Sequence, residues 1–110
     1  MLIRSQNKEV LVNFDVSAGI EIAEGTTKTV ITSYITGCSY LLGEYSTKAK
    51  AMKVLDMIQE AYADEKLVDY TTCLQRKEIE KMDDSTILAL RNELMKKAVF
   101  QMPEDSEVEE

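Results

Sequence analysis

The side chains that could do chemistry in this chain are two cysteines and a few carboxylates, because the sequence contains no histidine. Histidine is the commonest general base near neutral pH, the usual activator of a Ser or Cys nucleophile, and the commonest metal ligand. Cys38 stands between Gly37 and Ser39, where a strained nucleophile turn can be imagined. Because no base accompanies it, we expect Cys38 to be a half-buried strand residue instead.

Metal and cofactor sites are not indicated by spacing either. Cys38 and Cys73 lack the C-x-x-C spacing of a zinc site or a redox pair. Glu80, Asp83 and Asp84 lack the alternating oxygen ligands and central glycine of a calcium loop. We expect the two aspartates to cap a helix.

Carboxylates on a short hairpin are the remaining candidates for acid–base chemistry. Glu21 and Glu24 are close enough in sequence to be considered, but such residues most often face water. The four glycines stand apart from one another, so no phosphate-binding loop is indicated. We therefore predict a protein that is not an enzyme, with no catalytic, cofactor-binding or metal-binding residues and no cofactor.

Composition indicates one ordinary globular unit. The 110 residues are 45% hydrophobic and 30% charged, which suits a single domain with one core. The net charge is −7, of which five acids within residues 104–110 supply −5. We expect a single α+β domain over residues 1–103 and an acidic disordered tail over 104–110. Imitation of nucleic-acid phosphate by this tail is a less favoured alternative.

Partners and location follow from the same composition. No basic stripe interleaved with aromatic residues is present, so nucleic-acid binding is not expected. Met1–Arg4 begins with strand-like alternation, and no apolar run approaches the roughly 20 residues that span a bilayer. We expect a soluble cytoplasmic protein that does not bind membranes and whose cysteines stay reduced.

The first half of the chain alternates in the manner of short antiparallel strands. Val10, Val12 and Phe14 share one face, while Leu11 lies on the other. Strands are predicted at Leu2–Ser5, Glu9–Phe14, Ile20–Ile22, Thr29–Ile35 and Tyr40–Leu42. Because their connections are short, we expect a small antiparallel meander of four to five strands.

A helix is predicted from Thr47 to Asp64, with Ser46 as its N-cap. Lys53 lies on the side that should face water. The residues expected to face the sheet fall at helical spacing: Ala51, Val54, Leu55, Ile58 and Tyr62. This amphipathic helix should therefore pack on the meander, with methionines filling gaps in the core.

The chain after Asp64 is more ambiguous. Residues 66–82 fit either a helix or a strand, and good helix formers from Gln75 to Lys81 favour the helix. Asp83–Ser85 should cap a further C-terminal helix. Val99–Pro103 should form a short final strand that docks Phe100 and Met102 on the body.

Four segments carry a resemblance: Met1–Gln6, Leu42–Thr47, Lys53–Gln59 and Val99–Asp105. In these segments the chain resembles a group of small uncharacterised proteins of Gram-positive bacteria, some of them associated with prophage or mobile elements. The resemblance implies a cytoplasmic bacterial protein and brings no activity, cofactor or catalytic residue with it.

Two classes of function remain open at this point. We favour a non-catalytic protein-interaction module of a prophage or mobile element, because the amphipathic stripes exceed what a small sheet needs. Its partner is then an unknown protein, with a homodimer or other homo-oligomer as one form. The alternative is an enzyme of unknown reaction that uses carboxylates or Cys38.

Overall fold

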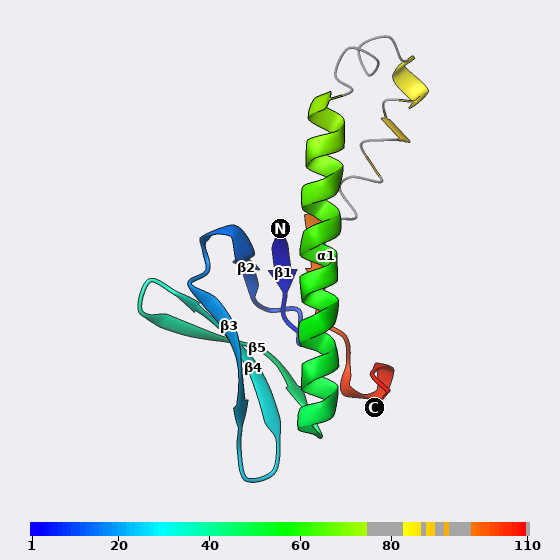
Figure 1. The fold of residues 1–110 in the computed structure, drawn as a ribbon. Coiled ribbons are helices and arrows are strands. Elements are labelled where there is room, and N and C mark those ends of the chain that lie inside the picture. Colours follow the sequence, from blue (N-terminus) through cyan, green and yellow to red (C-terminus); the bar gives the residue numbers. More distant parts are fainter. Residues whose placement is uncertain (75–82, 87, 90–91, 93–97, 110) are drawn as a thin grey trace.

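One long helix and two three-stranded sheets form most of the described molecule (Figure 1). A computed structural model describes residues 1–74, 83–86, 88–89, 92 and 98–109, apart from the side chains of 68–74. Its elements are β1 (Leu2–Arg4), β2 (Leu11–Asn13), η1 (Phe14–Val16), β3 (Gly19–Glu24), β4 (Thr29–Ile35), β5 (Cys38–Tyr45), α1 (Lys48–Leu74), β6 (Val99–Gln101) and η2 (Asp105–Glu107). The predicted α+β class is confirmed.

The meander consists of three strands in the order β3-β4-β5, all antiparallel. β4 is rich in β-branched residues, which suit a pleated surface. Its inward residue Ile31 is fully buried opposite Ile22 of β3. Thr36 and Gly37 join β4 to β5 with φ angles of 46° and 80°, as a two-residue hairpin turn requires.

A second sheet, in the order β2-β1-β6, joins the two ends of the chain. Ile3 of β1 lies opposite Val12 in an antiparallel pair and opposite Phe100 in a parallel pair. Val12 is buried and Leu11 is 57% exposed, as the alternation in the sequence predicts. The predicted strands therefore divide between two sheets. β1 pairs with β2 and with the distant β6, and it does not pair with the meander.

The helix α1 begins at Lys48, and Thr47 rather than Ser46 is its N-cap. The Lys50 amide donates to Thr47 Oγ1 over 3.2 Å, while Ser46 donates both its amide and its hydroxyl to Asp105 Oδ1. The prediction of Ser46 is thus wrong by one residue, because a tertiary partner occupies its hydroxyl. Helix continues to Leu74, which settles the first part of residues 66–82; residues 75–82 lie outside the described chain.

The core lies between α1 and the sheets. Ala51, Val54 and Ile58 of α1 are at most 2% exposed and belong to one cluster with Ile31 and Tyr45. Leu55 and Tyr62 are only half-buried, so the predicted stripe is correct at its centre and open along one side. The methionines divide similarly: Met1 and Met102 are buried, whereas Met52 and Met57 are exposed.

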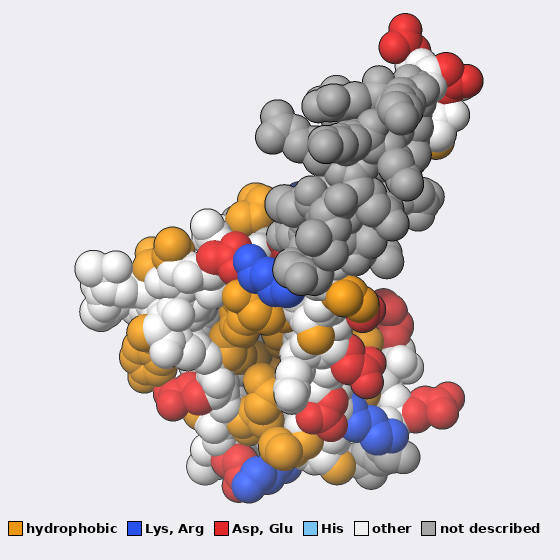
Figure 2. Space-filling view, turned by 45° about the horizontal axis from the view of Figure 1, so that its top comes forward, with side chains coloured by type: hydrophobic (Ala, Val, Ile, Leu, Met, Phe, Trp, Pro, Cys, Tyr) orange, Lys and Arg blue, Asp and Glu red, His pale blue; other side chains and the backbone are white. Residues whose placement is uncertain are grey.

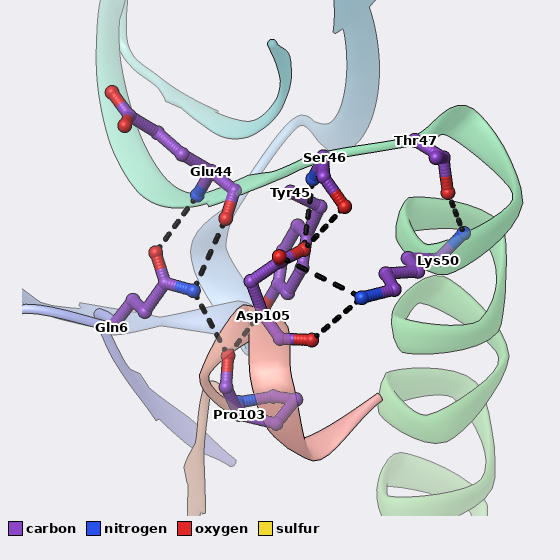
Figure 3. Close-up of polar contacts among 8 residues, drawn as sticks. All are labelled: Gln6, Glu44, Tyr45, Ser46, Thr47, Lys50, Pro103 and Asp105. Atoms are coloured by element: carbon purple, nitrogen blue, oxygen red, sulfur yellow. Dashed lines mark hydrogen bonds and ion pairs between the residues drawn. The ribbon is translucent and has the colours of Figure 1, made fainter. Parts of the chain in front are cut away.

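The structure describes residues 104–109 against the body, whereas the sequence predicted a disordered tail over residues 104–110; residue 110 lies outside the described chain. Asp105 Oδ1 accepts from the Ser46 amide over 2.8 Å, and Lys50 Nζ donates to the Asp105 carbonyl over 3.1 Å (Figure 3). Val108 is 6% exposed within the core cluster. One apolar anchor and one shared carboxylate therefore hold a segment whose composition alone indicates disorder.

Gln6 fixes the approach of this segment to β5 (Figure 3). Its Nε2 donates to the carbonyls of Glu44 and Pro103 over 3.2 and 3.1 Å, and its Oε1 accepts from the Glu44 amide over 2.9 Å. Tyr45 adds a donated hydrogen bond of 2.8 Å to the same Pro103 carbonyl. The predicted docking of the final strand is confirmed, with Met102 1% exposed and Phe100 packed against the core.

Part of the predicted C-terminal helix can be checked. Residues 84–86, 88–89, 92 and 98 are helical, and Asp83 Oδ1 accepts from the Thr86 amide over 2.8 Å and from the Ser85 hydroxyl over 3.1 Å. Hydrogen bonds from the side chain and then the amide of Thr86, followed by the Ser85 hydroxyl, lower the pKa of Asp83, as expected of a capping carboxylate. Within the described part of the chain, no helix has the length and apolar character needed to cross a membrane.

Candidate functional site

The residues considered for chemistry in the sequence lie apart. Cys38 is exposed at the start of β5 instead of half-buried. Glu21 and Glu24 are three positions apart on β3, so their side chains lie on opposite faces of the sheet. Glu24 also pairs with Lys48 at 3.3 Å. The side chain of Cys73 and all of Glu80 lie outside the described residues.

A cleft lies between α1 and the η1–β3 segment, and we call it the β3–α1 cleft. Its volume is about 490 Å³. Most of its lining is apolar, and the side chains that form it are Phe14, Ala18, Ile20, Leu55, Ile58 and Tyr62. Figure 2 shows hydrophobic side chains in a hollow between the meander and the helix. Gln59, Asp15 and Ser17 add polar atoms at its margin.

An aromatic pair closes one end of the cleft. The rings of Phe14 and Tyr62 meet edge to face, with centroids 4.7 Å apart and an interplanar angle of 69°. Lys66 Nζ lies 5.2 Å from the centroid of the Tyr62 ring, within the range of a cation–π contact. Two large rings and a long side chain thus hold this end of the cleft in one shape.

A charged cluster surrounds Asp15 at the same end. Asp15 Oδ2 accepts from the α-amino group of Met1 over 2.8 Å, and Asp15 Oδ1 lies 3.2 Å from Lys66 Nζ. The hydrogen bond from the α-amino group, followed by the one from Lys66, lowers the pKa of Asp15 to about 2. The bond to Asp15 raises the pKa of Lys66. Glu65 Oε2 lies 3.1 Å from the same amino nitrogen, so two side chains tie the α-amino group to η1 and α1.

A second ion pair, Glu24–Lys48, joins β3 to α1, and neither of its residues lines the cleft. Both partners are more than half exposed, so the pair adds little to stability. Its importance is geometric, since it joins the last residue of β3 to the first residue of α1. Of the β3 residues, Gly19 and Ile20 line the cleft, and they lie between the two ion pairs along the chain.

The sequence predicts that Leu55 and Tyr62 of α1 pack on the sheet, and it does not predict a cleft beside them. Leu55 and Tyr62 fit the helical stripe, and nothing in their spacing shows that β3 stands away from them. The sequence predicts a strand that ends at Phe14, whereas Phe14 begins the 3-10 helix η1. The one available signal was the width of the apolar stripe, which exceeded the needs of a small sheet.

The described residues hold no group of three His, Cys, Asp or Glu side chains arranged to bind a metal ion. The cleft can receive apolar groups and offers hydrogen-bonding atoms only at its margin. Comparison of the chain with protein-family models, with curated proteins and with solved structures finds no match.

Proposed function

We propose that the protein is a non-catalytic interaction module of a prophage or mobile element, and that a partner protein binds in the β3–α1 cleft. The observation that supports this most is the half-buried apolar wall formed by Leu55, Tyr62 and Ile20. Ile20 and Tyr62 pack against the core, and all three side chains remain partly exposed where they line the cleft. Filling the cleft with a partner's side chains would remove apolar surface from water, which is the main driving force for association.

The polar groups around the cleft favour recognition over catalysis. Asp15, which lines the cleft, is engaged by two cations. A general acid or base needs a free proton site directed at a substrate. A carboxylate held in ion pairs, as Asp15 is, instead suits a preformed binding surface.

Site-specific photo-cross-linking in the native host tests this proposal. A photoreactive amino acid at Gln59, in the cleft, is compared with one at Glu60, which is exposed on α1 and does not line the cleft. We expect a discrete adduct from position 59 that is absent from position 60. An adduct of twice the chain's mass would identify the partner as a second copy.

A cleft variant completes the test. Leu55→Lys puts a charge on the apolar wall and should abolish the adduct at position 59, provided that circular dichroism shows a folded protein. Lys53→Leu, on the exposed side of the same helix turn, serves as the control and should leave the adduct in place. Equal adducts at positions 59 and 60, or an adduct that persists in Leu55→Lys, would contradict the proposal.

A further inference from the structure

We propose that the partner contributes an extended segment that adds to the outer edge of β3, with apolar side chains in the β3–α1 cleft and basic side chains on the opposite face. This inference rests on the proposed function and specifies how the same cleft is used. Among the described strands, β3 pairs with β4 alone, so its other edge carries backbone groups without a strand partner. Such an edge is a template for strand addition.

The alternation of β3 assigns a face to each side chain of the added segment. Ile20 lines the cleft, and Ile22 lies opposite the buried Ile31, so both point towards α1. Glu21, between them, points to the other face and lies opposite Thr32. A strand paired with β3 would place every second side chain beside Leu55 and the residues between them beside Glu21.

Two ion pairs that flank β3 along the chain set the length of the segment. Asp15–Lys66 and Glu24–Lys48 connect α1 to the chain on either side of β3. Residues 19–23 lie between them. At about 3.3 Å per residue, this edge accommodates a paired segment of roughly five residues.

The negative charge on the exposed face of β3 favours a partner segment with basic side chains. Glu21 is exposed and has no Lys or Arg nitrogen within 4 Å among the residues that the structure describes. It lies next to Tyr34, whose phenol pKa it raises through a hydrogen bond and its negative charge. The whole chain carries a net charge of −7, which favours the approach of a cationic partner. Lysines beside Glu21 would therefore complement the exposed face of β3.

A designed peptide provides the test. Acetyl-Val-Lys-Val-Lys-Val-Lys-Val-amide is titrated into the isotope-labelled full chain and followed by amide chemical shifts and hydrogen exchange. We expect shifts at Leu55 and Gln59 together with slowed exchange of amides in residues 19–23. A control peptide with the same residues in the order Lys-Lys-Lys-Val-Val-Val-Val should bind at least tenfold more weakly, because it cannot separate its apolar and basic faces.

Backbone pairing is tested by N-methylation of the same peptide. In one peptide, methyl groups on the backbone amide nitrogens of the three lysines remove the hydrogen-bond donors from one edge of the peptide strand. In a second peptide, methyl groups on the backbone amide nitrogens of the internal valines remove the donors from the other edge. We expect the affinity of one methylated peptide to fall tenfold or more and the affinity of the other to stay unchanged. Equal binding of both, or shifts in the cleft without slowed exchange in residues 19–23, would overturn strand addition while leaving the cleft as the partner site.

The charge requirement has its own matched pair of variants. Glu21→Lys should weaken binding of the lysine peptide threefold or more, whereas Glu60→Lys, the same change of charge on the exposed side of α1, should not. Equal weakening by both variants would show that net charge alone acts. If no peptide binds at millimolar concentration while the cross-link at position 59 persists, this inference is wrong and the proposed function stands; if both are absent, both are wrong.

Discussion

The phenol of Tyr45 donates a 2.8 Å hydrogen bond to the carbonyl of Pro103, 58 positions further along the chain. Tyr45 is 1% exposed, and burial, followed by the charges of Glu104, Asp105 and Glu107, raises the pKa of its phenol. The hydroxyl therefore remains a donor over the whole range in which the protein would be studied. This bond joins the last strand of the meander to the end of the chain.

Replacing Tyr45 by Phe should lower the free energy of unfolding by about 1 kcal/mol, because a buried hydrogen bond is lost. The Pro103 carbonyl keeps its bond from Gln6, so no acceptor is left without a partner. Denaturation by urea measures the change. Tyr40→Phe, at a side chain that is 39% exposed, is the control and should be nearly neutral. Equal losses for the two variants would contradict the role of the bond.

Truncation distinguishes a docked C-terminal segment from a free one. Deleting residues 104–110 removes Asp105 from Ser46 and Val108 from the core, so the melting temperature should fall by several degrees. Deleting residues 109–110 alone removes two acids and should leave melting almost unchanged. If both proteins melt like the full chain, then the segment is a solvated tail after all.

The loss of unfolding free energy on shortening a side chain of α1 should differ sharply between neighbouring positions. Val54→Ala, at a fully buried site, should cost about 2 kcal/mol of unfolding free energy. Leu55→Ala should cost less despite the larger truncation, because Leu55 borders the cleft and is only half-buried. Lys53→Ala is the exposed control. A larger loss at Leu55 than at Val54 would show that the cleft is closed in solution.

Acid should weaken the attachment of the N-terminus. Because the pKa of Asp15 is lowered to about 2 from 3.8, the folded state binds fewer protons than the unfolded chain between these values. The contribution of Asp15 is therefore present above about pH 4 and is lost as the pH falls towards 2. Urea denaturation from pH 2 to 7 should show a shallower loss in Asp15→Asn, whereas Asp56→Asn, on exposed α1 surface, should follow the parent protein.

The hairpin between β4 and β5 offers a stabilising change. Thr36 has a φ of 46°, which a β-branched residue adopts unfavourably, and Asn-Gly is the preferred pair in such a turn. Thr36→Asn should raise the free energy of unfolding by roughly 0.5–1 kcal/mol. The matched control is Thr26→Asn in the β3–β4 connection, where φ is not positive. A gain at residue 26 equal to that at residue 36 would refute the backbone explanation.

Local patterns predicted much of the fold. The β-branched run of β4, the alternation around Val12 and the stripe of α1 each reflect neighbours within a few residues, so periodicity shows them directly. The docking of Phe100 and Met102 also followed from local reasoning, since apolar residues in an acidic segment need a place to be buried.

The failures share a different physical origin. The N-cap is Thr47 rather than the predicted Ser46, because the amide and hydroxyl of Ser46 donate to Asp105, 59 positions away. The tail from Glu104 is ordered because Val108 finds a site in the core. The cleft arises because β3 is held apart from Leu55, a relation between elements that no single segment contains. Long-range partners, rather than weak local signals, limited the prediction.

Pairing of β1 with β6 has a consequence for synthesis on the ribosome. The Met102 amide donates to the Arg4 carbonyl over 3.0 Å, so β1 takes one of its neighbours from a segment that is translated much later. At roughly 5–20 residues per second, β1 waits on the order of ten seconds for β6 to be translated and for longer to emerge. The meander and α1 are local enough to assemble during that delay. The β1–β6 pairing should therefore form after the meander and α1 have assembled.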